Sequence, residues 1–129
     1  MIRISLPWPN ADLSPNARVH WSAHARAKKS AKNAAWGFTK AVMGAIGLRH
    51  GAVTGPVAVT LTFHPEIDRG RDVDNMQARM KAGLDGIALA LGIDDKHFRP
   101  VSVIGEKRKP ACVIVELFPM DKPVERDAK

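Results

Sequence analysis

The chain has 129 residues, of which 45% are hydrophobic, and it carries a formal net charge of +7 at pH 7. This length is typical of one domain, and the apolar fraction suffices for a modest core, so no second domain is expected. The single cysteine excludes an intrachain disulfide. No apolar stretch approaches the roughly eighteen residues of a membrane span and no signal segment opens the chain, so a cytoplasmic protein is predicted.

The N-terminal part of the chain predicts a strand followed by an ordered loop. Residues 2–6 alternate apolar and polar side chains, which is the period of a half-buried strand, and Pro7 ends it. Residues 10–21 predict a loop that carries Arg18, His20 and Trp21. Such cationic and aromatic side chains can hold a DNA backbone and stack on an unpaired base. For Trp21 itself, packing beneath the following helix is the preferred alternative.

A long basic helix is predicted over residues 22–46, because alanine and other good helix formers dominate this stretch. Gly47 is placed to end it. The expected apolar contacts of the helix are Trp36, Phe38, Val42 and Ile46. Residues 13–65 contain no Asp or Glu but many basic side chains, and such a block of one charge is typical of a protein that binds phosphate backbones. The alternative is a solvated basic face.

The second half predicts a strand, a helix and a terminal hairpin. Residues 57–63 are β-branched and alternate, which favours a strand with one buried face. Residues 73–91 carry larger apolar side chains at steps of three and four, which is the period of one helical face. Residues 101–107 and 111–118 predict two strands that, across a three-residue connection, most simply form a β-hairpin.

Together these elements predict an α/β sandwich over residues 1–119, in which two main helices pack on a small mixed sheet that ends in a C-terminal β-hairpin. Residues 120–129 are polar and predict a disordered tail. The strand that ends at Phe63, the following loop and the next helix converge on Asp72. Binding sites are often built where such loops meet a rigid scaffold.

Acidic residues flank the predicted helix over residues 73–91. Asp72 and Asp74 stand at its start, and Asp95 follows its end. Three carboxylates from a helix start and a later loop are the oxygen ligands that a hard divalent cation such as Mg²⁺ takes. The alternative is structural, because Asp suits helix N-caps and the positive end of the helix dipole, and the later acidic pair can form a polar turn.

Four segments carry a family resemblance. They are Leu6-Pro7-Trp8-Pro9, Asp68-Arg69-Gly70-Arg71-Asp72-Val73-Asp74-Asn75, Lys81 to Asp85, and Gly92-Ile93-Asp94-Asp95. These segments resemble the RusA-type Holliday junction resolvases, small phage and prophage endonucleases, and the correspondence runs with interruptions from about residue 2 to residue 118. A lone Asp-x-Asp is weak evidence, whereas this motif together with the later Asp-Asp and the flanking matches is fairly specific.

The resemblance implies a RusA-like fold and a metal-dependent endodeoxyribonuclease that resolves four-way DNA junctions by paired symmetric nicks. In the family, the two aspartates of the first motif and the second aspartate of the later pair are the metal-binding catalytic groups, which here are Asp72, Asp74 and Asp95. Mg²⁺ is the expected cofactor, with Mn²⁺ as an alternative ion. Family members act as homodimers, so the implied partners are branched DNA and a second copy of the chain.

The chain departs from the family at the catalytic lysine. The family commonly has a lysine four residues after the second aspartate of the first motif, where this chain has Ala78. Lys81 keeps the family's spacing to the next acid, Asp85, which suggests a three-residue insertion and a helix one turn longer. Positions four and seven residues after Asp74 share a helical face, so Lys81 is the candidate catalytic lysine. A solvated helix lysine is the alternative.

The predicted DNA-binding residues are Arg18, His20, Arg26, Lys28, Lys29, Lys32, Arg69 and Arg71. Arg69, Arg71 or Lys81 would also neutralise the phosphate that is cleaved.

Two other classes of protein compete with this hypothesis. One is a nucleic-acid-binding module without catalysis. The other is a different Asp-x-Asp enzyme, either a phosphatase, whose motif fails because Met76 stands where Thr is required, or a nucleotide-sugar transferase, for which 129 residues leave little room.

Overall fold

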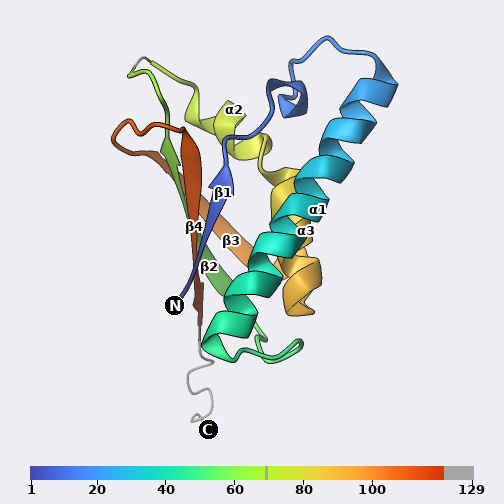
Figure 1. Ribbon diagram of the computed structural model, residues 1–129, viewed down its shortest axis with the longest axis vertical. Coiled ribbons are helices and arrows are strands. Elements are labelled where there is room, and N and C mark those ends of the chain that lie inside the picture. Colours follow the sequence, from blue (N-terminus) through green and yellow to red (C-terminus); the bar gives the residue numbers. More distant parts are fainter. Residues whose placement is uncertain (69, 121–129) are drawn as a thin grey trace, which may run out of the picture.

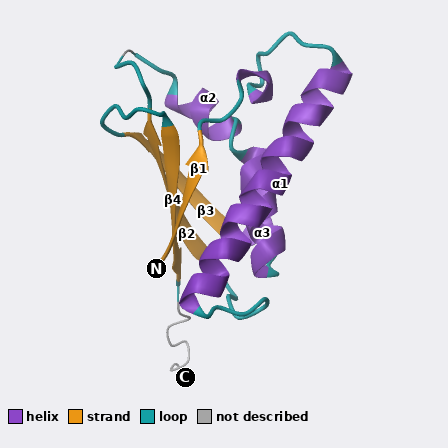
Figure 2. Ribbon diagram, in the orientation of Figure 1, coloured by secondary structure: helices purple, strands orange, loops and turns teal. Residues whose placement is uncertain are grey.

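The computed structural model describes residues 1–68 and 70–120 of the chain. In this part a four-stranded mixed sheet carries helices on one face (Figures 1 and 2), which confirms the predicted α/β sandwich. Two short 3-10 turns at Ala11–Leu13 and Asp95–His97 complete the elements. The main elements are β1 (Ile2–Pro7), α1 (Trp21–Ile46), β2 (Val57–His64), α2 (Val73–Ala78), α3 (Lys81–Leu91), β3 (Phe98–Ile104) and β4 (Cys112–Pro119).

The strand order is β1-β4-β2-β3, and it corrects the predicted C-terminal hairpin. β4 pairs antiparallel with both β1 and β2, whereas β3 pairs parallel with β2, so β2 separates the two strands expected to form the hairpin. The parallel pairing follows from the connection, because α2 and α3 cross over between β2 and β3 and return the chain in the same direction. The central position of β4 suits its Val113, Val115 and Leu117, which are fully buried.

The core lies between the sheet and the α1–α3 pair. The predicted inward face of β2 is confirmed, because Val57, Val59, Leu61 and Phe63 are all buried. The prediction for α1 was right in its extent and wrong in its face. The buried side chains of α1 are Ala27, Ala35, Thr39 and Met43, whereas Trp36, Phe38 and Ile46 are exposed and Val42 is partly buried.

Small residues explain which face of α1 is buried. α1 packs along α3, and the backbones approach so closely at Gly86 that a Cβ there would overlap the carbonyl oxygen of Lys32. Side chains the size of Trp36 or Phe38 do not fit at such an approach, so alanines occupy it and the larger apolar groups point away. At the end of α1, Gly47 adopts the left-handed conformation (φ 71°) and caps the helix, as predicted.

The predicted helix over residues 73–91 is broken into α2 and α3, so the helix is not simply one turn longer. Arg79 and Met80 separate the two helices. Met80 has φ −89° and ψ 0°, and its N–H donates to the carbonyl of Gln77 at 3.0 Å, a 3-10 bond that tightens the end of α2. The predicted apolar face persists across the break, since Met76, Met80, Leu84, Ile87 and Leu91 are buried.

No helix in the described part of the chain has the length and apolar character needed to cross a membrane. Of the predicted tail at residues 120–129, only Met120 belongs to the described residues; its N–H donates to the carbonyl of Pro56 at 2.9 Å.

Candidate active site and nucleic-acid interface

The first two aspartates of the motif lie at the start of α2. The Asp72 side chain caps the helix by accepting a hydrogen bond from the N–H of Asn75 at 3.2 Å. Asn75 is itself held by Ser14, whose hydroxyl accepts from the Asn75 amide at 3.1 Å. Asp74 lies in the first turn of α2, and both carboxylates are exposed. Asp72 therefore has the structural role considered for it, and capping leaves the group accessible to solvent.

The third aspartate of the motif is bound by the candidate lysine. The Lys81 ammonium donates to Asp95 at 2.8 Å and to Asp85 at 2.9 Å. Lys81 is the first residue of α3, and Asp95 begins the 3-10 turn that follows α3. The Lys81 side chain is 69% exposed, yet it is not simply solvated, because two carboxylates hold it beside Asp95. The break between α2 and α3 gives Lys81 this position at the start of its own helix.

These contacts shift the pKa values of Lys81, Asp85 and Asp95. The hydrogen bond with Asp85, followed by that from Lys81, lowers the pKa of Asp95 from 3.8 to about 2. Burial raises the pKa of Asp85, so Asp85 takes up a proton before Asp95 does. The hydrogen bond to Asp95, followed by that to Asp85, raises the pKa of the Lys81 ammonium. Asp95 is therefore ionised and Lys81 charged at neutral pH.

The carboxylates of the motif suit a hard cation by their chemistry, since all offer oxygen donors. Residues 1–68 and 70–120 contain no group of three or more His, Cys, Asp or Glu side chains arranged to hold a metal ion. One Asp95 oxygen instead contacts the Lys81 ammonium. To bind one ion together, the side chains of Asp72, Asp74 and Asp95 would have to adopt an arrangement different from the one in this structure.

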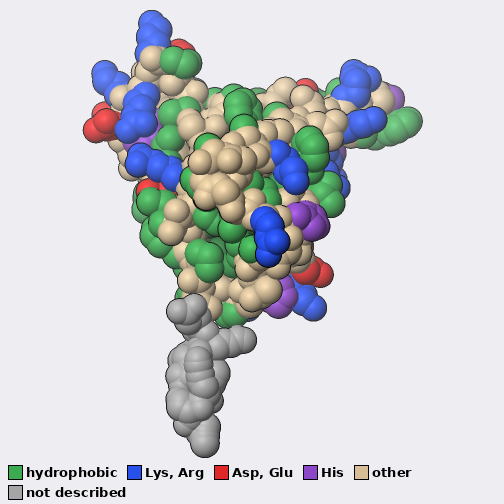
Figure 3. All heavy atoms as spheres, turned by 60° about the horizontal axis from the view of Figure 1, so that its bottom comes forward, with side chains coloured by type: hydrophobic (Ala, Val, Ile, Leu, Met, Phe, Trp, Pro, Cys, Tyr) green, Lys and Arg blue, Asp and Glu red, His purple; other side chains and the backbone are tan. Residues whose placement is uncertain are grey.

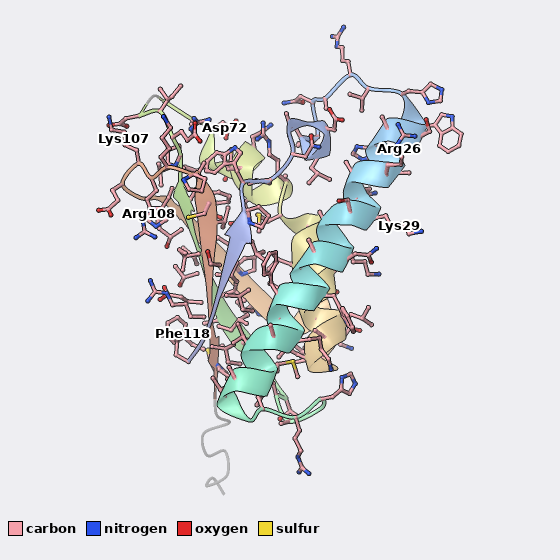
Figure 4. The ribbon with its side chains drawn as sticks, viewed as in Figure 1. Arg26, Lys29, Asp72, Lys107, Arg108 and Phe118 are labelled. Carbon is pink, nitrogen blue, oxygen red and sulfur yellow. The ribbon has the colours of Figure 1, made fainter. Side chains whose placement is uncertain are left out.

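The predicted DNA-binding residues cluster around the start of α1. Six of them are exposed on the preceding loop and the first half of α1: Arg18, His20, Arg26, Lys28, Lys29 and Lys32. Arg71 is half-buried before α2, and Arg69 lies outside the described residues. Many Lys and Arg side chains gather at two projecting corners of the face in Figure 3. In the view of Figure 4, Asp72 lies between Arg26 and Lys29 of α1 and Lys107 and Arg108 of the β3–β4 loop.

Trp21 does not pack beneath α1, which corrects the preferred prediction. Its side chain is 75% exposed, and its ring lies tilted by 34° against the ring of His20, with 5.5 Å between the centroids. His20 is held in place because its ring accepts from the N–H of Ser22 and caps α1. The reason for the exposure is position: Trp21 is the first residue of α1, where the helix extends past the sheet (Figure 1).

Sequence reasoning missed three basic residues near these elements. Lys107 and Arg108 lie in the β3–β4 loop, and the N–H of Arg108 donates to the carbonyl of Pro65 at 2.9 Å, which ties this loop to the end of β2. A predicted hairpin turn gave no sign that the loop neighbours the segment before α2. Arg79 lies between α2 and α3, where the sequence predicted continuous helix.

No model of a known protein family matches the chain. The chain is 41% identical over 115 residues to an uncharacterized protein of Xylella fastidiosa, and the match covers 89% of this chain and 74% of that protein. The matched length includes most of the elements described above. The chain therefore belongs to the same family as this protein of Xylella fastidiosa.

Proposed function

We propose that the protein is a metal-dependent endodeoxyribonuclease of the RusA type that resolves four-way DNA junctions by paired nicks. The observation that carries the proposal is the contact between Lys81 and Asp95, 2.8 Å apart across 14 residues of sequence. Resolvases of this type commonly have a lysine near their aspartates, and Lys81, which looked displaced in the sequence, binds Asp95. The exposed basic residues of α1 give the surface that such a substrate needs.

Asp72, Asp74 and Asp95 would hold Mg²⁺. The bound ion supplies a water of lowered pKa and stabilises charge on the leaving oxygen. Asp95 is kept ionised by its neighbours, so no proton has to leave it before it can act as a ligand. Lys81 would exchange the Asp95 oxygen for a phosphate oxygen as DNA arrives, which places a positive charge on the phosphate that is attacked. Asp85, its second partner, would keep the ammonium near the site.

The DNA would lie along the basic start of α1. Arg26, Lys28, Lys29 and Lys32 would contact phosphates, which fixes the position of the DNA without reading its sequence. Trp21 projects from this end beside His20 and would stack on an unpaired base where the arms of a junction meet. A homodimer would place one site on each of the two symmetry-related strands of a junction in the cytoplasm.

A second candidate is a junction-binding protein without catalysis. The observation that favours it is the present arrangement of the carboxylates: Asp72 caps α2 and Asp95 is paired with Lys81. In this candidate the basic surface and Trp21 keep their roles, and the acidic residues serve the fold alone.

The two candidates differ in whether the wild type cleaves a four-way junction in Mg²⁺, and the nuclease proposal further requires that this cleavage depend on the carboxylates. Asp74→Asn removes the negative charge of an exposed residue without changing its size, so cleavage of a labelled four-way junction in Mg²⁺ should be abolished while binding is kept or tightened. Glu116→Gln, on β4 opposite Arg3, is the matched control and should cleave as the wild type does. If Asp74→Asn cuts at the wild-type rate, Asp74 has no part in the reaction.

A further inference from the structure

The β3–β4 loop, residues 105–111, is tied by its backbone to the end of β2. The N–H of Gly105 donates to the carbonyl of Phe63 at 2.8 Å, and the N–H of Arg108 donates to the carbonyl of Pro65 at 2.9 Å. These two bonds hold the loop beside the segment that leads from β2 to α2. The loop therefore presents its side chains from a defined position.

The buried side chain of His64 adds a third contact to this loop. His64 is the last residue of β2 and is 6% exposed, and its Nδ1 atom lies 2.7 Å from the carbonyl oxygen of Glu106. Because a carbonyl oxygen can only accept, Nδ1 carries the proton and donates this bond. The packing is close, since a Cβ at Gly105 would come within 2.7 Å of the His64 ring. His64 thus fixes the position of the loop from the sheet below it.

The loop carries basic side chains that an external anion can reach. Lys107, Arg108 and Lys109 are exposed, and the one acidic residue of the loop, Glu106, pairs with Arg108 at 3.7 Å. Among the residues that the structure describes, Lys107 and Lys109 form no ion pair with a carboxylate, although the adjoining segment 66–68 has two exposed acidic residues. The two lysines are therefore the candidate ligand-binding groups of the loop.

The loop and the start of α1 lie on opposite sides of the first motif. In Figure 4, Lys107 and Arg108 lie on one side of Asp72, and Arg26 and Lys29 lie on the other. Groups that are apart in one view are apart in space, so these are two separate basic surfaces. DNA that contacts both of them has to pass the start of α2.

Hydrogen bonds connect the start of α2 to both basic surfaces. On the side of α1, the ring of His24 donates to the carbonyl of Asp12 at 2.9 Å, and the hydroxyl of Ser14 accepts from Asn75 at 3.1 Å. Asn75 in turn donates to the cap, Asp72. On the other side, the backbone bond from the β3–β4 loop reaches the segment before α2. The acidic start of α2 is thus held between the two surfaces.

We propose that the β3–β4 loop, positioned by His64, is a second DNA-binding surface, which binds the phosphate backbone of one junction arm while the start of α1 binds another. This inference rests on the proposed function, which identifies the ligand as branched DNA. Lysine ammonium groups bind phosphates as point charges and read no sequence. The arms of a four-way junction leave the branch point in different directions, so two separate basic surfaces suit two arms. A linear duplex along α1 has no second arm for the loop, and the loop therefore favours branched DNA.

The first test measures binding in EDTA, so it is independent of cleavage. The double variant Lys107→Met with Lys109→Met should bind a four-way junction about tenfold more weakly and lower the slope of log K against log salt by about 2, because two phosphate contacts are lost. Its binding of linear duplex should stay within about twofold of the wild type. Lys28→Met with Lys29→Met, on α1, should weaken the binding of both DNAs.

The matched control is Lys40→Met with Arg49→Met, which removes two exposed charges from the far half of α1 and the loop after it and should change neither DNA. Junction binding that is unchanged in the β3–β4 loop variant would overturn the second surface and leave the proposed nuclease standing. An equal loss for junction and duplex would overturn the assignment to a second arm. Loop-dependent junction binding without any cleavage would count against the nuclease alone.

The second test concerns His64 as the positioning residue. His64→Leu removes the donor to Glu106, whereas His64→Asn keeps an N–H at the same distance from the backbone as Nδ1. The leucine variant should bind the junction about threefold more weakly with duplex binding unchanged, and the asparagine variant should restore most of the loss. Unchanged duplex binding shows that each variant is folded. A folded leucine variant that binds the junction as the wild type does, or an asparagine variant no better than leucine, would overturn the role of His64.

Discussion

Lys81 connects an acidic residue within α3 with one beyond the end of that helix. It binds Asp85 one turn along its own helix and Asp95 beyond the end of that helix. An exposed ion pair of this kind contributes little to stability, so its main effect is on charge and position. It lowers the pKa of Asp95 and holds the Lys81 ammonium beside that carboxylate.

The contacts of Asp95 with Lys81 and Asp85 predict how the pKa of Asp95 changes when either partner is removed. Asp85→Ala and Lys81→Met each remove one of the hydrogen bonds that lower the pKa of Asp95, so each should raise that pKa from about 2 toward 3.8. Because the folded-state value is below the ordinary one, Asp95 stabilises the wild type fully above pH 3.8, and this contribution is lost as the pH falls through about 2. Carboxyl NMR titration would measure the shift. Lys40→Met, from the far half of α1, is the control; an Asp95 pKa near 2 in both cluster variants would refute the assignment.

Replacing Trp21 distinguishes stacking on a base from general attraction to phosphates. Trp21→Ala should weaken binding of a four-way junction by about tenfold, as expected for the loss of one stacked base, and leave binding of linear duplex nearly unchanged. A 2-aminopurine at the branch point should be quenched by the wild type and not by the variant. Trp36→Ala, which removes another exposed tryptophan of α1, should behave as the wild type. Equal quenching by Trp21→Ala would exclude the stacking role.

At the scale of elements, the sequence predicted what depends on local pattern. The alternation in β2, the extent of α1 and the apolar face from Met76 to Leu91 were all readable from periodicity. The strand order could not be predicted from periodicity, because strand pairing depends on contacts between residues far apart in the chain. Adjacency in sequence wrongly favoured a hairpin of β3 and β4. The inward face of α1 was missed for a similar reason, since its alanines became a contact face only through the closeness of α3.

The same limits apply to the candidate site. Asp72, Asp74, Asp95 and Lys81 could be selected from spacing and resemblance, but the pairing of Lys81 with Asp95 depends on the break after α2, which no residue pattern indicated. Arg79 was overlooked because a lone arginine within an expected helix reads as a solvated side chain. The burial of its Nε atom is a property of the folded chain.

The close contact between α1 and α3 predicts how the free energy of unfolding changes when a glycine in it is replaced. Gly86→Ala should lower the free energy of unfolding by about 2 kcal/mol, because the added methyl group would meet the backbone of Lys32 and cannot be accommodated by a side-chain movement. Gly37→Ala is the matched control on α1: its Cβ would meet nothing within 4 Å, so the better helix propensity of alanine should raise stability by about 1 kcal/mol. Urea denaturation measures both, and a neutral Gly86→Ala would show that the helices can separate without cost.

At the scale of the whole molecule, one long continuous part of the chain has basic side chains and no acidic ones. Residues 13–65 contain no acidic side chain and carry the basic residues at the start of α1, while the carboxylates of the motif lie at the start of α2 and after α3. Carboxylates repel a phosphate backbone unless a cation is present, so such a protein can bind DNA broadly and act on it only where a metal ion joins the two. The basic, acid-free segment together with the separate carboxylates supports the proposed nuclease over a structural protein.

The most direct measurement is the position of nicks on a four-way junction labelled on each strand in turn. Two nicks are expected at symmetric positions on opposite strands in Mg²⁺, with ligatable ends, and none in EDTA or with Asp74→Asn. A protein that binds the same junction tightly but leaves every strand intact in both Mg²⁺ and Mn²⁺ would contradict the proposed activity and identify the chain as a junction-binding protein.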